Sequence, residues 1–183
     1  MKKILTPLNI LLTLFIASFS SAMALDTPST SKSDMIADFE RAKAFSLEYM
    51  EAMPADAYAF KPTEDIRSFA EQFLHMADAN FGLTAMIAGV DNPMGEKKLE
   101  KDEASQSKAA AIKAVSDSYD FVLSTLKNMS EEQLSEEIKL FNAFELTKGQ
   151  GMAKIFEHAT HHRGQTTIYI RLKGIKPPDE KLF

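Results

Sequence analysis

The residues that could do chemistry are concentrated in one short stretch, residues 157–165, which reads EHATHHRGQ and holds three of the four histidines in the sequence. His158 and His162 are four residues apart, so in a helix their imidazoles project from one face, one turn apart. Such a pair can bind one divalent ion, and a third ligand from elsewhere would leave coordination positions for water or substrate. A pair of ordinary packed or surface histidines is the alternative interpretation.

The third ligand must come from another segment of the chain. His75, the fourth histidine, lies far upstream in another expected helix. His161 is three residues from His158 and could pair with it in place of His162. Adjacent helical residues point about 100° apart, so His161 and His162 do not suit the same ion. The geometry therefore favours His162, with His161 beside the site.

Hydrophobic periodicity predicts four long helices, which must position these histidines. Ser68 and Thr147 open two of them with capping boxes, in which a Ser or Thr hydroxyl and a Glu or Gln three residues later satisfy backbone amides. A similar pattern at Ser130 predicts a further short helix. Residues 91–106 should form a loop, with or without one short turn of helix, and residues 138–146 a brief extended segment or loop. We therefore expect an all-α fold, a four-helix bundle. The expected helices cover residues 34–53, 69–88, 107–128 and 148–173.

Helical spacing places the histidines in the seam between helices, where bundle proteins build metal sites. His75 lies on the inner face of the second helix if Phe69 or Ala70, Leu74, Ala79 and Met86 also face inward. Gly164 costs roughly 1 kcal/mol relative to alanine inside a helix, which indicates that another backbone approaches closely there; simple tolerance of the glycine is the alternative. The inner face of the last helix should carry Met152, Ile155, His158, His162, Gln165 and Tyr169.

The first 24 residues have the order of a secretory signal peptide: Lys2 and Lys3, an apolar run over residues 10–19, and small residues before an expected cleavage site after Ala24. An uncleaved membrane anchor is the alternative, but the apolar run is shorter than the roughly 20 residues that a spanning helix needs. The chain has no cysteine, which excludes a lipid-anchored lipoprotein and disulfides. We expect a periplasmic or secreted protein without membrane association after signal cleavage.

Residues 25–183 are long enough for one domain with its own core. We expect a flexible leader over residues 25–33, which are rich in Ser, Thr and Pro, and a metal-binding bundle over residues 34–183. Loss of Lys2 and Lys3 takes the formal net charge from −5 to −7. This acidic balance argues against nucleic acid as a partner. A small-molecule substrate and a homodimer are compatible with the composition.

Two segments resemble the DinB family, whose members are also called YfiT-like. The first covers residues 158–178, where HATHHRGQ is followed by YIRLKGIKPP. The second covers residues 60–80, where FKPT is followed by SFAEQFLHMADAN. The specific feature is a histidine on the second helix combined with the pattern His-x3-His-Arg-Gly-Gln, and the resemblance extends over nearly all of residues 25–183.

The resemblance implies a four-helix bundle that binds one divalent metal ion, usually zinc or nickel, through three histidines. Carried over to this sequence, the ligands are His75, His158 and His162, which supports His162 over His161. Family members range from thiol-cofactor-dependent transferases and isomerases to metal-dependent hydrolases. Low-molecular-weight thiol transferases are expected in the cytoplasm, so the signal peptide argues against that branch.

We therefore expect an exported metal-dependent enzyme, a hydrolase or a transferase. No Ser-His-Asp or Cys nucleophile pattern is available, so hydrolysis would use metal-bound water. Glu71, Asp78 and Gln165 are the nearest polar candidates to orient that water or a ligand histidine. One alternative is a non-catalytic metal-binding or stress-related bundle. The other is a cargo-carrying bundle with a large apolar cavity and no metal.

Overall fold

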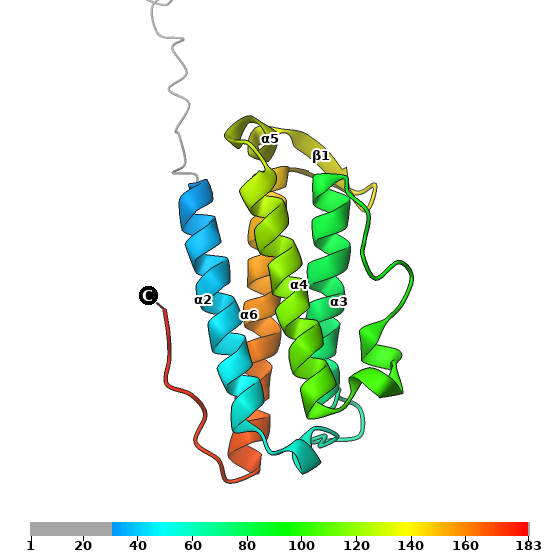
Figure 1. The fold of residues 1–183 in the computed structure, drawn as a ribbon, viewed down its shortest axis with the longest axis vertical. Helices are drawn as coiled ribbons and strands as arrows, with labels where there is room; N and C mark the ends of the chain where they lie inside the picture. The colour runs from blue at the N-terminus through cyan, green and yellow to red at the C-terminus, as the bar shows by residue number, and fades with distance from the viewer. Residues whose placement is uncertain (1–30, 183) are drawn as a thin grey trace, which may run out of the picture. The chain divides into compact units, whose positions relative to one another are not determined.

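The computed structural model describes residues 31–182, and four long helices form most of this part (Figure 1). Each helix begins after a Ser or Thr whose side-chain oxygen accepts a hydrogen bond from the amide three residues later. This bond satisfies an amide that has no partner within the helix. The expected all-α four-helix bundle is confirmed. The helices are α2 (Lys32–Ala52), α3 (Phe69–Ala88), α4 (Lys108–Asn128) and α6 (Lys148–Leu172).

The bounds of these helices lie close to those predicted from sequence. Helix α3 begins and ends where expected, and Gly89 follows it in the left-handed conformation with a φ of 72°. Helix α2 begins at Lys32, earlier than expected, because the Ser31 hydroxyl caps it. Residues 31–33 therefore belong to the bundle rather than to a flexible leader. The predicted signal peptide and the rest of the predicted leader lie outside the described residues.

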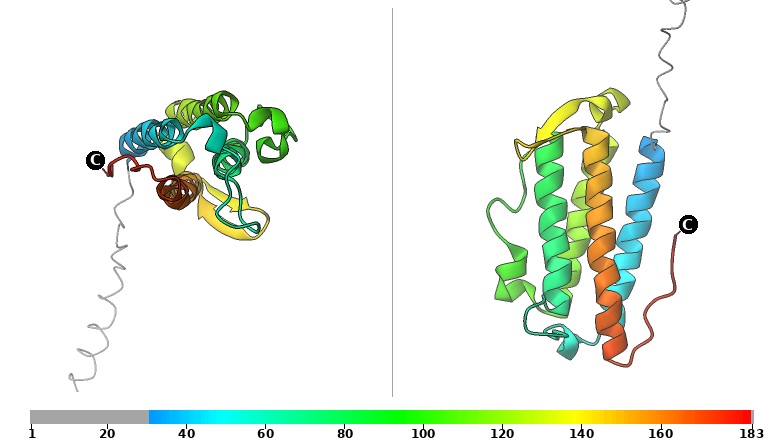
Figure 2. Two further views of the ribbon diagram at one scale, coloured as in Figure 1. Left: turned by 90° about the horizontal axis from the view of Figure 1, so that it is seen from below. Right: turned by 180° about the vertical axis from the view of Figure 1, so that it is seen from behind.

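The four helices pack in a ring in which α2 contacts α4 and α6, and α3 contacts the same two helices. Helices α2 and α6 run in one direction along the bundle, and α3 and α4 run in the other (Figures 1 and 2). As a result, α3 and α6 are antiparallel neighbours, whereas α3 and α4 are parallel neighbours. A helix of about 20 residues is about 30 Å long, so parallel neighbours need a connection that returns along the bundle.

Residues 89–107 form this returning connection and lie beside α3 (Figure 1). The sequence predicts a loop with at most one short turn of helix here, and the structure has two short 3-10 helices, η2 (Leu99–Lys101) and η3 (Glu103–Ser105). The carboxylate of Asp78, on α3, accepts hydrogen bonds from the amides of Leu99 and Glu100 at 2.9 and 3.1 Å. These two bonds anchor η2 against the side of α3.

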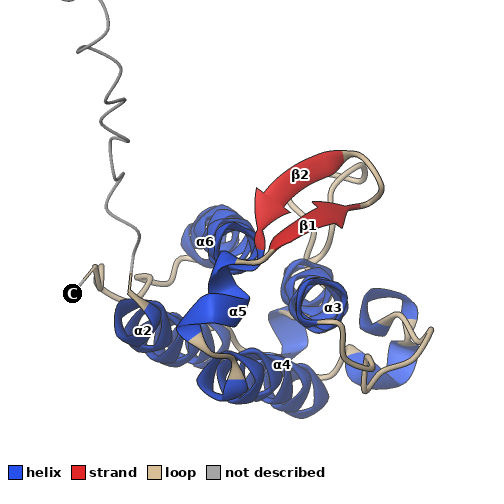
Figure 3. Ribbon diagram, turned by 90° about the horizontal axis from the view of Figure 1, so that it is seen from above, coloured by secondary structure: helices blue, strands red, loops and turns tan. Residues whose placement is uncertain are grey.

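Shorter elements connect the remaining helices at the ends of the bundle (Figure 3). The short helix predicted after Ser130 is confirmed. Residues 138–146 belong to an antiparallel hairpin, in which Leu140 pairs with Phe144 across a turn where Phe141 and Asn142 have φ values of 54° and 56°. The bounds are η1 (Ala55–Ala57), α5 (Glu131–Ser135), β1 (Glu137–Leu140) and β2 (Phe144–Thr147).

Apolar side chains from all four long helices fill the space between them. The predicted inner face of α6 is confirmed, since Met152, Ile155 and Tyr169 are buried. The predicted inner face of α3 is wrong in part, because Met86 is 50% exposed. Met86 lies about three turns after His75 on the same side of α3. This side is the margin of the buried face rather than its centre, so the histidine lies at the edge of the core.

Gly164 lacks the close neighbour that the sequence predicts. A Cβ atom added there would have no heavy atom within 4 Å beyond its own helix, because this side of α6 is exposed. The close approach occurs instead at Gly151, where an added Cβ would lie 2.9 Å from Cδ1 and 3.0 Å from Cγ1 of Ile87. Glycine at position 151 therefore lets the first turns of α6 pack tightly against α3.

Alanine at these two glycines should have opposite effects on stability. Gly164→Ala should raise the free energy of unfolding by about 1 kcal/mol, because alanine is the better helix former and its methyl group meets nothing. Gly151→Ala should lower the free energy of unfolding by about 1–3 kcal/mol, because the methyl group overpacks against buried Ile87. Urea titration of both variants and the parent measures the two changes. Shifts of the same sign would contradict this account of the α3–α6 contact.

Candidate metal centre

Antiparallel packing of α3 against α6 brings the histidine of one helix beside two histidines of the other. The ring centroid of His75 lies 5.2 Å from that of His158 and 4.7 Å from that of His162. The centroids of His158 and His162 are 4.4 Å apart. One nitrogen of each ring lies within 4.8 Å of the nitrogens of the other two. The three predicted residues therefore lie close enough together to hold one metal ion.

The carboxylate of Glu100 orients His75 from the connection between α3 and α4. Its Oε2 atom lies 2.9 Å from His75 Nδ1, and its Oε1 atom accepts a hydrogen bond of 2.8 Å from Arg67 Nε. Burial by itself raises the pKa of Glu100, but hydrogen bonds from Arg67 and His75 outweigh burial and lower the pKa to about 2. An ionised carboxylate can only accept, so His75 Nδ1 donates, and in the neutral ring the lone pair is on His75 Nε2.

A chain of hydrogen bonds that ends at a backbone carbonyl orients His162. The Tyr169 hydroxyl donates to the Arg67 carbonyl at 2.7 Å and accepts from Gln72 Nε2 at 3.1 Å. Gln72 therefore presents its Oε1 atom to His162 Nδ1, which lies 2.7 Å away. Because an amide oxygen only accepts, His162 Nδ1 donates and His162 Nε2 keeps its lone pair. These proton positions follow from the network as a whole.

His158 completes the group without a partner on its second nitrogen. Its Nε2 atom lies 3.1 Å from Nε2 of His162, and its Nδ1 atom is buried with no hydrogen-bond partner among residues 31–182. Two nitrogen ligands at 2.0–2.1 Å from a tetrahedral zinc ion are about 3.3 Å apart. The observed separation is close to that value, so the geometry of this pair fits two ligands of one ion.

Burial keeps the two α6 histidines in their neutral form. It lowers the pKa of His158 to about 4, with a further contribution from the neighbouring His75. It lowers the pKa of His162 to about 3, with further contributions from His158 and His75. Neutral imidazole is the form that binds a metal. These two rings therefore do not have to lose a proton when they bind an ion at neutral pH.

The other polar residues predicted near the site have different partners. His161 is exposed, and its Nε2 atom lies 2.6 Å from the side-chain nitrogen of Gln165. Glu71 accepts from the amide of Ser68 in the capping box of α3, and Asp78 holds the amides of η2. Glu71 therefore has the capping role that the sequence favours for it, and neither Asp78 nor Gln165 is hydrogen-bonded to His75, His158 or His162. A role for Gln165 in orienting bound water stays a prediction.

Sequence reasoning missed the two residues that do orient the histidines, Gln72 and Glu100. Gln72 is 3% exposed and lies one turn before His75, so it is a polar residue on the buried face of α3. That pattern is a signal that could have identified it. Glu100 lies in the connection between helices, and no local pattern predicts where such a segment passes.

Comparison with known proteins places the chain in one family. A family model described as the DinB superfamily matches residues 38–166, a range that contains all three histidines. The YjoA protein of Bacillus subtilis (strain 168) is 28% identical over 132 residues, which cover 69% of this chain and 80% of that protein.

Two solved structures show the same fold. A DinB-like protein from Bacillus cereus ATCC 10987 has a TM-score of 0.71 at 11% identity and covers 84% of this chain and 99% of its own. The DinB-like protein YjoA from Bacillus subtilis has a TM-score of 0.62 at 22% identity and covers 81% of this chain and 96% of its own. With the family match over most of the bundle, the conclusion is that the chain belongs to the DinB superfamily.

Proposed function

We propose that the chain binds one divalent metal ion through His75, His158 and His162 and acts as a metal-dependent hydrolase. The observation that carries this proposal is the convergence of three imidazoles, two of which are held through Nδ1 by Glu100 and Gln72. Partners of this kind orient metal ligands and raise their basicity. Zinc or nickel suits a set of three neutral nitrogen donors.

Three neutral imidazoles leave the double positive charge of the ion uncompensated. When bound, the ion supplies a Lewis acid that polarises a substrate carbonyl and lowers the pKa of a water molecule to about 7. The protein residues around the site hold its geometry. Glu100 stays ionised at neutral pH because its pKa is about 2, so it orients His75 rather than exchanging protons with a substrate.

A pocket beside the histidines provides room for a substrate. It has a volume of about 500 Å³, and its wall includes Gln72 and Glu100, which hold two of the three imidazoles, together with Arg67. This volume is within the range of small-molecule pockets. None of the three histidines lines this pocket, but the His75 side chain is 29% exposed, so solvent reaches the group on that side. A partly exposed ligand supports an enzyme over a bundle in which the ion only braces the helices. We propose a small-molecule substrate, since an acidic chain does not attract nucleic acid.

Alanine substitutions should separate the ligands from the flanking histidine. His75→Ala, His158→Ala and His162→Ala should each abolish tight metal binding and hydrolysis, because two remaining imidazoles hold a divalent ion weakly. His161→Ala should keep most of the metal binding and most of the hydrolysis, because His161 is exposed and lies outside the cluster of three histidines. Elemental analysis measures the metal, and a panel of ester, amide and thiol-transfer substrates measures the activity.

The matched pair in this set is His161→Ala and His162→Ala, which remove neighbouring side chains of one type. Far-ultraviolet circular dichroism checks that each variant remains helical. If His161→Ala lost its metal and His162→Ala did not, the ligand would be His161 rather than His162. Full metal occupancy with no turnover across the panel would refute the hydrolase and favour the non-catalytic metal-binding or stress-related alternative.

Metal removal should destabilise the protein without unfolding it. An ion that binds only the folded state adds about 2.7 kcal/mol to the free energy of unfolding at a free concentration of a hundred times its Kd. A chelator should therefore lower the melting temperature at about pH 7.5, where imidazoles are neutral. The core should keep the metal-free chain folded. An unchanged melting temperature, in protein shown to have lost its metal, would contradict the coupling between site and fold.

The same measurement at lower pH tests the histidine pKa values. Unfolded histidines take up protons near pH 6.5, whereas burial and then neighbouring imidazoles hold the pKa of His158 at about 4 and that of His162 at about 3 in the folded chain. Between the unfolded pKa and the two folded pKa values, the unfolded state binds more protons than the folded state. The free energy of unfolding of the metal-free protein should therefore decrease as the pH falls from about 6.5 towards the folded pKa values. Below the folded values, protons displace the ion and the chelator effect should disappear.

We further propose that the chain is exported and that its mature form begins at Leu25. The support is the order of Lys2 and Lys3, the apolar run and the small residues ending at Ala24. Within residues 31–182, no helix has the length and apolar character that a membrane span requires. Intact-mass measurement on exported protein should give the mass of residues 25–183. A cytoplasmic species that retains Met1 would overturn the proposal.

A further inference from the structure

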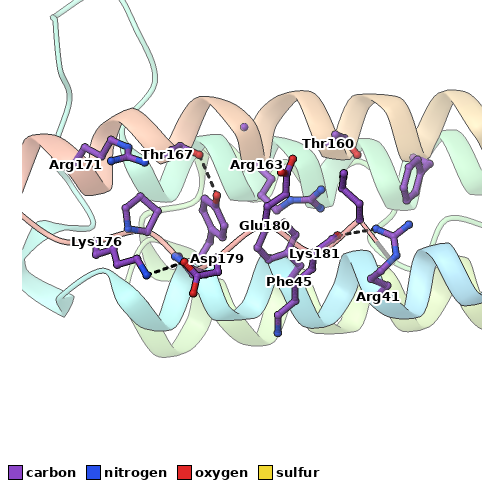
Figure 4. Close-up of a pocket in the computed structure, with 16 residues that line it drawn as sticks. Arg41, Phe45, Thr160, Arg163, Thr167, Arg171, Lys176, Asp179, Glu180 and Lys181 are labelled. Atoms are coloured by element: carbon purple, nitrogen blue, oxygen red, sulfur yellow. Dashed lines mark hydrogen bonds and ion pairs between the residues drawn. The ribbon is translucent and has the colours of Figure 1, made fainter.

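A second cavity lies beside α6 (Figure 4). It is formed between α2 and α6, has a volume of about 650 Å³, and is bordered by residues 176–182 of the C-terminal segment. Phe156 and Thr160 each lie two residues before a site histidine, so they point about 200° away from it. The lining residues of α6 share one helix face, at Phe156, Thr160, Arg163, Gly164, Thr167 and Arg171.

Arg163 places a buried positive charge in this cavity. The residue is 7% exposed, and its guanidinium carbon lies 4.7 Å from the centroid of the Phe45 ring. Its Nη1 atom is buried with no hydrogen-bond partner, and no carboxylate in residues 31–182 lies within 4.0 Å of its nitrogens. Contact with an aromatic face offsets part of the cost of a buried cation but satisfies no N–H group. The arrangement therefore favours an anionic ligand.

Three other cations around the cavity already have carboxylate partners. The pairs are Arg41 with Asp38, Lys176 with Asp179 and Lys181 with Glu48. Arg41 also donates a hydrogen bond of 3.0 Å to the Lys181 carbonyl, which holds the C-terminal segment across the groove (Figure 4). Exposed ion pairs are weak, so a ligand can enter by displacing this segment. Arg163 and Arg171 line the cavity without a carboxylate partner among residues 31–182, and Arg163 is the one whose charge is buried.

The rest of the cavity is suited to an apolar skeleton. The rings of Phe45 and Phe156 line it from α2 and α6, and Arg41 lies 5.9 Å from the Phe156 centroid. The buried Tyr49 hydroxyl accepts a hydrogen bond of 3.1 Å from Thr167, so it retains its own proton for a ligand. A guanidinium matches a carboxylate through two parallel hydrogen bonds, and aromatic rings pack against ring or alkyl groups.

We propose that this cavity binds a small carboxylic acid with an apolar skeleton. The carboxylate pairs with Arg163 and accepts from Tyr49, and the skeleton lies against Phe45 and Phe156. The cavity volume is within the range of small-molecule sites. Because the cavity and the histidines occupy opposite faces of α6, this ligand is distinct from the substrate of the proposed hydrolase.

Phenylacetate and hexanoate are suitable probes for calorimetric titration into the protein produced from the full-length chain. Both should bind saturably with a Kd of about 1 mM or tighter, whereas 2-phenylethylamine, which carries a cation in place of the carboxylate, should not bind. Arg163→Met keeps the length of the side chain without its charge and should weaken binding of both acids at least tenfold. Lys113→Met, which removes an exposed cation on α4, is the matched control and should leave binding unchanged.

Further measurements test whether a loss of carboxylate binding comes from misfolding of the variant or from loss of the metal. Arg163→Met should melt no lower than the parent, because it removes an unpaired buried cation. If this variant does not fold, Tyr49→Phe, which removes only the second donor, should weaken phenylacetate binding several-fold. Chelator-treated protein should bind both acids as before. The proposal is overturned by an absence of saturable binding, by equal affinity in Arg163→Met and the parent, or by binding that disappears with the metal.

Discussion

The packing of α3 against α6 is the contact on which the candidate metal centre depends. It joins His75 to two histidines that lie far away in the sequence, and it is close because Gly151 leaves room for Ile87 at one end. The buried hydrogen bond between Gln72 and His162 crosses the same interface at 2.7 Å. Side chains on packed helices keep their geometry better than side chains on loops. The seam therefore supplies a preorganised set of nitrogen donors rather than a flexible one.

Arg67 connects the supports of two histidines, although it lies on no helix. Its guanidinium holds the Glu100 carboxylate that orients His75, and its carbonyl ends the hydrogen-bond chain that orients His162. Glu100 reaches the site because α3 and α4 are parallel, so the connection between them must return along α3, where Asp78 anchors it. The connections of this bundle are therefore part of the site, and the helix order is what brings them there.

Helix α6 presents two chemically different faces through adjacent residues. His162 faces α3 and is kept neutral by burial, whereas Arg163 faces α2 and stays charged next to Phe45. A helix turns by about 100° per residue, which is enough to put neighbours into separate environments. Among residues 31–182, Arg163 Nη1 is buried with no hydrogen-bond partner, and so is His158 Nδ1, the ring nitrogen that does not face the other histidines. Such atoms are uncommon in folded proteins, and Arg163 borders the cavity in which we propose a ligand.

The sequence by itself determined the four helices, the caps of α3 and α6, and the shared face of His158 and His162. Periodicity, capping boxes and the four-residue spacing depend only on local backbone geometry. It also favoured His162 over His161, which is exposed in the structure. Only the tertiary structure decided that Glu100 and Gln72 hold the rings and that Met86 faces solvent. It also decided that Gly151 rather than Gly164 is the close contact, and that Arg163 is buried with no carboxylate partner in the part of the chain that the structure describes. These features depend on which helix faces meet and on the path of the α3–α4 connection, and both are set by long-range packing that no local pattern encodes.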